Sequence, residues 1–224
     1  MVKLIRKIIS VILISVSSIC FWEVGKKQHM YIDNIIEHKK MLSELGEVDD
    51  IQDYLFDKPY DWISVSDTKI NYPLVTATDN QYYLNRDIEG NYNKAGSIYY
   101  DASDSPYNGT LTVIYGHSMR DGSYFNNLHY LYRDKNKFNN SILTISNKEG
   151  DTYYKPLGFA TYMGNQPFYR KVDNMNINDA IESLKEDCDY INNVKPNEDS
   201  HIIALVTCEY SQDNGRLVVF YISE

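Results

Sequence analysis

The chain has 224 residues, of which 43% are hydrophobic and 24% are charged. This composition supports a folded core and excludes a chain that is disordered throughout. The net charge is −9, which argues against a nucleic-acid partner because binding to phosphates needs a basic surface. The charge is uneven, since residues 1–27 contain five basic residues and one acidic residue. A basic start on an acidic body predicts a targeting segment joined to a globular domain.

Residues 8–22 form an apolar stretch with basic residues on both sides. As a helix it would span about 22 Å, which is short of the roughly 30 Å hydrocarbon core of a bilayer. Neighbouring apolar residues and snorkelling Lys and Arg side chains extend it. We expect an uncleaved, single-pass membrane anchor, with its N-terminal tip inside the cell and the body outside. A cleaved signal peptide is the alternative.

Residues 28–58 are predicted to form a pair of helices. Apolar residues recur at near-helical spacing from Tyr31 to Leu45, and Gly46 interrupts the pattern. A second short helix follows and ends at Lys58-Pro59. The expected organisation is therefore an anchor over 1–27, N-terminal helices over 28–58 and a globular domain over 59–224.

From Trp62 onward, short apolar runs alternate with turn residues, a pattern typical of β-strands. The 21 tyrosines agree with a protein that is mainly β, because Tyr suits the faces of sheets. About eight strands at this spacing predict a barrel or a sandwich. The candidate strands are 62–66, 68–75, 96–101, 110–116, 141–146, 151–163, 201–208 and 216–222.

Two helices are predicted between these strands, over residues 122–132 and 177–192. The first places His129 on an apolar face, so we interpret it as a packed histidine and not as a catalyst. The second places Cys188 on an apolar stripe, where it is interpreted as a small buried hydrophobic residue. With Cys20 and Cys208 it makes three cysteines, and their spacing predicts neither a disulfide framework nor a zinc site.

Cys208 differs from the other two cysteines because it ends an apolar strand at a loop, where a side chain can be both held and exposed. Eight residues later Arg216 begins another apolar run, after a segment rich in turn residues. Two antiparallel strands joined in this way bring Cys208 and Arg216 to the same end of a sheet. The alternative for Arg216 is a surface residue at the start of a strand.

His117 also ends an apolar run, directly after Gly116. His201 begins the strand that Cys208 ends, so it lies roughly 20 Å away and cannot pair with the thiol. A Cys, a His and an Arg at one rim of a β-structure support acyl transfer, with thiolate attack on a carbonyl, proton donation to a leaving amine and charge stabilisation.

The segment Leu205-Val206-Thr207-Cys208 resembles the TLxTC signature of sortases, the cysteine transpeptidases of Gram-positive cell surfaces. Ala204 stands where that signature begins with Thr, four residues before the cysteine, and we expect little effect on the chemistry. Tyr115-Gly116-His117 resembles the strand-end histidine motif of the family, and Arg216 lies where the family has its arginine.

Further segments resemble class B sortases in order and spacing, and the resemblance extends over essentially the whole chain. These segments are Asp61-Trp62-Ile63, Ile70-Asn71-Tyr72-Pro73, Asp79-Asn80-Gln81-Tyr82-Tyr83-Leu84 and Gly96-Ser97-Ile98. The resemblance implies an eight-stranded β-barrel with an N-terminal helix pair and a helix in the loop before the cysteine strand. It implies no cofactor and no metal; Asp101 and Asp104 are interpreted as loop acids and not as a calcium site.

Carried over residue by residue, the resemblance makes Cys208 the nucleophile and His117 the general acid and base. Arg216 would hold the substrate carbonyl and stabilise the oxyanion. The implied substrate-binding positions are Asn80, Leu84, Tyr169, whose match is looser, and Glu209, whose role is open.

The implied substrate is a surface protein with a C-terminal sorting signal, a pentapeptide motif cleaved before its last residue. The acyl group would rest on the cysteine and pass to an amine of a peptidoglycan precursor or a pilin. The enzyme would be anchored in the cell membrane, with its catalytic domain extracellular. Two alternatives remain open: a cysteine hydrolase on the same scaffold, with water as acceptor, and a non-catalytic surface-binding module in which Cys208 is inert.

Overall fold

The computed structural model describes residues 2–48, 50–104, 109–211 and 213–223. By their contacts the residues divide into two units, Met1–Glu47 and Val48–Glu224. The first unit is one helix, α1 (Val2–Leu45), which runs unbroken through the expected boundary at residue 27. Within it, Ile5–Lys26 is long and apolar enough to cross a membrane, and none of its side chains is buried. Signal sequences near an N-terminus have the same length and composition.

The second unit begins with the short helix α2 (Ile51–Leu55). The Asp50 side chain caps it by accepting a hydrogen bond from the Gln52 backbone N–H, and Leu55 is buried. The two helices expected on either side of Gly46 are thus present. The first does not begin near residue 28, as expected, but continues from the apolar N-terminal segment.

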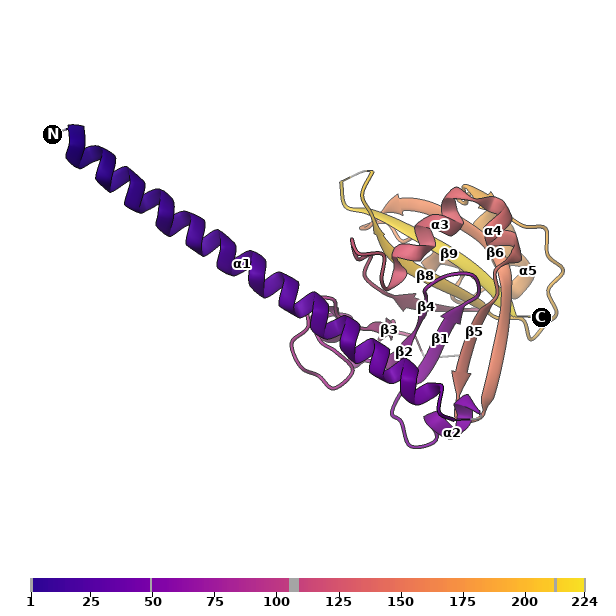
Figure 1. Ribbon diagram of the computed structural model, residues 1–224. Helices are drawn as coiled ribbons and strands as arrows, with labels where there is room; N and C mark the ends of the chain where they lie inside the picture. Colours follow the sequence, from indigo (N-terminus) through magenta and orange to yellow (C-terminus); the bar gives the residue numbers. More distant parts are fainter. Residues whose placement is uncertain (1, 49, 105–108, 212, 224) are drawn as a thin grey trace. The chain divides into compact units, whose positions relative to one another are not determined.

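The second unit is a closed β-barrel, as predicted (Figure 1). Eight strands follow one another around the barrel in the order β5-β1-β2-β3-β4-β8-β9-β6, and pairing between β5 and β6 closes it. All eight predicted strands are present, with ends shifted by a few residues. They are β1 (Asp61–Val65), β2 (Asn71–Thr76), β3 (Ile98–Tyr100), β4 (Leu111–Tyr115), β5 (Leu143–Asn147), β6 (Gly150–Met163), β8 (Ile202–Glu209) and β9 (Gly215–Ser223).

Strands β8 and β9 separate two hydrophobic cores because successive side chains point to opposite faces. On one face, Ile203 and Leu205 join a core that fills the barrel interior and includes residues of α3 (Leu128–Arg133) and α4 (Lys135–Asn140). On the other face, Ala204 and Val206 join a core covered by α5 (Ile177–Lys185). Cys208 continues this second series, so its side chain belongs to the outer face of the barrel.

The predicted helix over 122–132 is shorter than expected and is followed by a second helix that the pattern did not indicate. It begins as a 3-10 turn, Phe125–Asn127, and continues as α3. Asp134 then caps α4 by accepting hydrogen bonds from the backbone N–H groups of Asn136 and Lys137. Asp134 has an extended backbone conformation, so α3 ends there and α4 begins after it.

The predicted helix over 177–192 ends at Lys185, so Cys188 lies beyond α5 and only partly buried. The acidic residues that follow Lys185 oppose a longer helix, because negative charge is unfavourable at a helix C-terminus. Tyr190–Ile191 instead forms the two-residue strand β7, which pairs with β6.

Candidate active site

A cavity of about 290 Å³ lies where β4, β8 and β9 reach one end of the outer face. Its lining contains Cys208, His117 and Arg216, the three residues that sequence reasoning placed at one rim. Three of the four expected substrate-binding residues also line it, namely Asn80, Leu84 and Tyr169. The structure therefore brings together six of the seven predicted site residues, which are contributed by five separate segments of the chain.

The ladder between β8 and β9 fixes the relation of Cys208 to Arg216. The two residues are direct partners in the antiparallel register, so both side chains stand on the outer face at the same end of the hairpin. Arg216 also pairs across to Tyr162 of β6. Its guanidinium donates a hydrogen bond to the Gly215 carbonyl, at 2.9 Å, and no other hydrogen bond of the guanidinium is present among the described residues. A guanidinium has further N–H groups that can bind a ligand.

His117 is placed by the tight packing of the residue before it. A Cβ on Gly116 would lie 2.7 Å from the Phe125 ring, so only glycine fits there. The Gly116 N–H donates to the Val206 carbonyl, and the Thr207 hydroxyl donates to the Gly116 carbonyl, at 3.1 and 2.8 Å. These bonds join the end of β4 to the strand that carries Cys208.

The His117 ring faces the segment that carries two of the expected substrate-binding residues. Its Nε2 lies 2.9 Å from the carbonyl oxygen of Leu84, in the 3-10 turn Tyr82–Asn85. A carbonyl only accepts, so Nε2 carries the proton and donates, which leaves Nδ1 of the neutral ring free to accept one. The histidine can therefore exchange a proton at Nδ1 while Nε2 holds its orientation.

His129 is packed, as expected, and it also supports the backbone of Cys208. It is 9% exposed, and its Nε2 lies 3.1 Å from the carbonyl oxygen of Cys208. Burial lowers the pKa of His129, so the ring is neutral at neutral pH and donates through an N–H. This contact was not predicted, because no sequence pattern indicates which backbone carbonyl a helix histidine will meet.

Four tyrosines line the cavity, and sequence reasoning found only Tyr169 among them. The others are Tyr99, Tyr115 and Tyr162. Burial, followed by nearby negative charge, raises the pKa of Tyr99 to about 12, and burial raises the pKa of the other three as well. Their hydroxyls are therefore protonated. Those of Tyr99 and Tyr115 already donate to the Asn80 carbonyl and the Asp101 carboxylate, so toward a peptide they can act as hydrogen-bond acceptors. The abundance of Tyr was the one available signal.

Glu209 is the predicted site residue that lies outside the lining. Its carboxylate accepts hydrogen bonds from the backbone N–H and the hydroxyl of Ser211, at 2.8 and 2.6 Å. Burial alone would raise the pKa of Glu209, but these hydrogen bonds outweigh it and lower that pKa. Glu209 thus shapes the loop after the cysteine.

His201 lies away from the cavity, as the sequence predicted, and Cys188 is also outside its lining. The His201 ring bonds to the Gly109 carbonyl and the Thr112 hydroxyl, at the opposite end of β8 from Cys208. Burial, with nearby negative charge, raises the pKa of the Cys188 thiol to about 12, which keeps it protonated and unreactive. Among the described residues, no group of three or more His, Cys, Asp and Glu side chains is arranged to hold a metal ion.

Comparison with known proteins places the barrel in a family. Residues 63–221 match the model of the sortase domain, and the chain therefore belongs to the sortase family. Two curated relatives are both class B sortases. It is 34% identical over 165 residues to sortase B of Listeria monocytogenes and 29% identical over 165 residues to sortase B of Staphylococcus aureus. Each match covers 70% of this chain, and 66% and 67% of the respective relatives.

Solved structures of class B sortases share the fold. Sortase B from Listeria monocytogenes superimposes with a TM-score of 0.63 at 27% identity, covering 76% of this chain and 97% of that one. A Streptococcus pyogenes class B sortase involved in pilus biogenesis gives a TM-score of 0.68 at 23% identity, covering 80% of this chain and all of that one. Of the two folds that strand spacing allowed, a barrel or a sandwich, the chain has the barrel, and it is a sortase barrel of the class B type.

Proposed function

We propose that this protein is a class B sortase that cleaves the C-terminal sorting signal of surface proteins and transfers the acyl group to an amine. The observation that carries the proposal is the pairing of Cys208 with Arg216 across β8 and β9, within a cavity that His117 also lines. A thiol, an imidazole and a guanidinium around one cavity are the groups that acyl transfer through a thioester requires.

In the first half-reaction the Cys208 thiolate attacks the carbonyl carbon of the scissile peptide bond. Negative charge develops on the carbonyl oxygen, and the guanidinium of Arg216 donates hydrogen bonds to it. The tetrahedral intermediate collapses when His117, in its protonated form, gives a proton to the leaving amine. The products are a thioester on Cys208 and the released C-terminal segment.

In the second half-reaction an amine attacks the thioester carbonyl. His117, now neutral, removes a proton from the attacking nitrogen, and Arg216 again stabilises the oxyanion. Cys208 leaves as a thiolate, and an amide bond joins the surface protein to the acceptor. Atoms and charges balance with no cofactor, because the proton that His117 gave in the first step is replaced in the second.

Asn80, Leu84 and Tyr169 are proposed to bind the sorting signal. Leu84 is exposed and offers an apolar contact, while Asn80 and Tyr169 offer polar groups on the cavity wall. Glu209 is proposed to act through the conformation of its loop, given its bonds to Ser211. Sites that combine apolar surface with a few placed polar groups are typical of peptide and ligand recognition.

The proposed partners are surface proteins with a sorting signal and, as acceptor, a peptidoglycan precursor or a pilin amine. Ile5–Lys26 is proposed to anchor the enzyme in the cell membrane as a single span, with the barrel on the extracellular side. Basic residues before the apolar segment favour a cytoplasmic N-terminal tip, in line with the positive-inside rule.

Intact-mass spectrometry of the full chain in detergent tests the proposal. The protein is incubated with a panel of sorting-signal peptides, with and without a small amine such as triglycine. We expect an acyl adduct on Cys208 that disappears faster with the amine than without it. If the adduct disappears equally fast without the amine, water is the acceptor and the protein is a hydrolase. An absent adduct, together with a Cys208 that resists iodoacetamide, would favour the non-catalytic module.

A further inference from the structure

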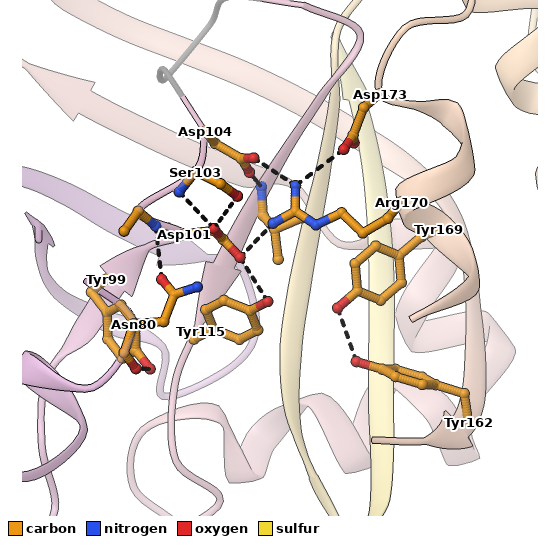
Figure 2. Close-up of polar contacts among 12 residues, drawn as sticks. Asn80, Tyr99, Asp101, Ser103, Asp104, Tyr115, Tyr162, Tyr169, Arg170 and Asp173 are labelled. Carbon is orange, nitrogen blue, oxygen red and sulfur yellow. Dashed lines mark hydrogen bonds and ion pairs between the residues drawn. The ribbon is translucent and has the colours of Figure 1, made fainter. Parts of the chain in front are cut away.

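Beside the cavity, but outside its lining, lies a cluster of charged side chains that the proposed reaction does not use (Figure 2). Arg170, on the 3-10 helix η3 (Phe168–Val172), contacts three carboxylates. Its Nη1 lies 2.5 Å from Oδ1 of Asp104 and 3.5 Å from Oδ2 of Asp173, and its Nη2 forms an ion pair with Asp101. The Asp101 and Asp104 side chains are only 4% and 8% exposed, so these are not surface salt bridges.

The two buried carboxylates connect Arg170 to the strand that leads to His117. Oδ2 of Asp104 accepts a hydrogen bond from the Val113 backbone N–H of β4, at 2.7 Å. Oδ2 of Asp101 accepts one from the Tyr115 hydroxyl, at 2.8 Å, and Tyr115 lines the cavity. Each acid therefore holds Arg170 on one side and β4 on the other.

The same cluster joins the two walls of the cavity. Figure 2 shows Asn80 on one side of Tyr115 and Tyr169 on the other. Oδ1 of Asn80 accepts a hydrogen bond from the backbone N–H of Ala102, at 2.7 Å, directly after Asp101. Tyr169 directly precedes Arg170 in the chain. The ion pair between Arg170 and Asp101 thus connects the wall that carries Asn80 to the wall that carries Tyr169.

Hydrogen bonds also fix the tyrosine hydroxyls on both sides of this connection. The Tyr162 and Tyr169 hydroxyls share a hydrogen bond at 2.9 Å, and the Tyr115 hydroxyl donates to Asp101. Hydrogen bonds therefore hold Tyr115 to Asp101 and Tyr169 to Tyr162, on the two sides that the ion pair of Arg170 joins. Networks of this kind fix hydroxyl directions more strongly than isolated bonds do.

Among the described residues of the cluster, Arg170 is the one cation that faces three carboxylates. Burial alone would raise the pKa of Asp101, but hydrogen bonds from Ser103 and Tyr115 outweigh it and lower that pKa to about 2. Asp101 is therefore ionised at any physiological pH and keeps its attraction for the guanidinium. A planar guanidinium reaches two carboxylates at once through separate nitrogens, which a lysine ammonium cannot do in the same geometry.

We propose that Arg170 is a positioning residue that sets the separation of the two cavity walls, and thereby the affinity for the peptide, without touching the peptide itself. The proposal rests on the proposed function. The register of β8 and β9 fixes Cys208 and Arg216 independently of the cluster. The bonds of Gly116 to Val206 and Thr207 hold the backbone directly before His117. Loss of the Arg170 contacts therefore weakens peptide binding and leaves the chemical step at Cys208 nearly unchanged.

Two variants of the full chain in detergent test this inference. Arg170→Lys keeps the positive charge but cannot contact Asp101 and Asp104 at the same time. The double variant Arg170→Gln with Asp104→Asn loses the bridge and keeps the net charge of the cluster, which limits the destabilisation caused by an unpaired buried charge. The matched control is Lys171→Gln, because Lys171 is the next residue of η3 and pairs with Asp187, at 2.6 Å, away from the cavity.

Steady-state acyl transfer is measured below the melting temperature of each variant. We expect both Arg170 variants to raise KM by roughly ten- to a hundredfold, with kcat within about threefold of the wild type, because small displacements of a binding wall cost binding energy. We expect the control to change neither. An unchanged KM in both Arg170 variants, or an equal effect of Lys171→Gln, overturns the inference and leaves the cluster a stabilising role only.

Hydrogen exchange separates failure of this inference from failure of the proposed function, since it needs no substrate. We expect faster exchange in residues 98–104 and 164–173 of Arg170→Lys, and unchanged exchange in β8 and β9. If the wild type forms no thioester, the proposed function fails and the exchange pattern still shows whether Arg170 joins the two walls. Unchanged exchange in both segments overturns the inference.

Discussion

Two regions around the cavity are held in place by different physical means. The region of Cys208 and Arg216 is held by the backbone ladder of β8 and β9, which pairs the two residues directly. In the second region Asn80 lies in a turn and Tyr169 on the 3-10 helix η3, and side-chain contacts through Asp101 and Arg170 join the two. The ladder fixes Cys208 and Arg216 through backbone hydrogen bonds that belong to the barrel itself. A side-chain cluster fixes the walls locally, so substitutions can alter substrate binding without moving the reacting groups.

The largest expected effect on activity comes from removing the sulfur of Cys208. Cys208→Ala should abolish acyl-adduct formation and transfer, because no other described residue of the cavity lining carries a thiol. Cys188→Ala is the matched control and should keep most activity, since that thiol lies away from the cavity with its pKa raised to about 12. Peptide cleavage by the two variants, followed by mass spectrometry, checks this, and equal losses would contradict the assignment of Cys208.

The same comparison explains what the sequence could and could not predict. Strand ends are readable from apolar runs, so Cys208, His117 and Arg216 could be placed at one rim from the sequence alone. The register then follows from the short turn between two strands. The contacts of Arg170 with Asp101 and Asp104 could not be predicted, because they join a short 3-10 helix to a loop more than sixty positions away, through side chains alone. Asp101 and Asp104 were interpreted as loop acids, and their burial depends on how distant segments of the fold pack together.

The resemblance to sortases predicted some residues of the cavity lining and also one residue that lies outside it. It placed Asn80 and Leu84 on the cavity wall, because a motif beside a strand keeps its position in the fold. It also indicated Glu209, which instead bonds to Ser211 outside the lining. His129 was correctly predicted as packed, yet its bond to the Cys208 carbonyl depends on how α3 packs against the barrel, which periodicity alone does not determine.

Replacing the guanidinium of Arg216, the partner of Cys208 in the ladder, should have the second largest effect on activity. Arg216→Lys keeps the charge beside Cys208 but replaces a planar fork of N–H groups with a single ammonium. We expect kcat/KM to fall by roughly a hundredfold or more, the usual cost of losing an oxyanion donor. Near-normal turnover would remove Arg216 from the mechanism. The melting temperature, measured in parallel, should change little because Arg216 makes one bond to the backbone.

Filling the tight contact before His117 should disturb both stability and activity. In Gly116→Ala the new Cβ would meet the Phe125 ring at 2.7 Å, so the ring or the strand end must move. We expect a loss of roughly 1–3 kcal/mol in the free energy of unfolding, typical of overpacking. Activity should fall as His117 shifts. The double variant Gly116→Ala with Phe125→Leu should recover part of the activity by making room, and urea unfolding with peptide turnover measures both effects.

The smallest expected effect concerns the acid stability of the side-chain cluster. The pKa of Asp101 is about 2 in the folded protein, against an ordinary value of 3.8. A lowered folded-state pKa stabilises the protein fully above about pH 4, and this contribution disappears as the pH falls toward 2. It amounts to roughly 2 kcal/mol. Asp101→Asn should therefore lower the free energy of unfolding at pH 7 and make it less sensitive to acid.

Urea unfolding of the wild type and of Asp101→Asn at pH 7 and pH 3 measures this difference, with Asp199→Asn as control because Asp199 is exposed. The wild type and Asp101→Asn should diverge at pH 7 and converge at low pH. Equal acid sensitivity of the two would mean that other carboxylates dominate the acid response.

Asp101→Asn should also raise KM for the peptide, because Tyr115 loses its acceptor and the ion pair with Arg170 is removed. An unchanged kcat in the same variant would confirm that the reacting groups are held by the ladder and the walls by the cluster.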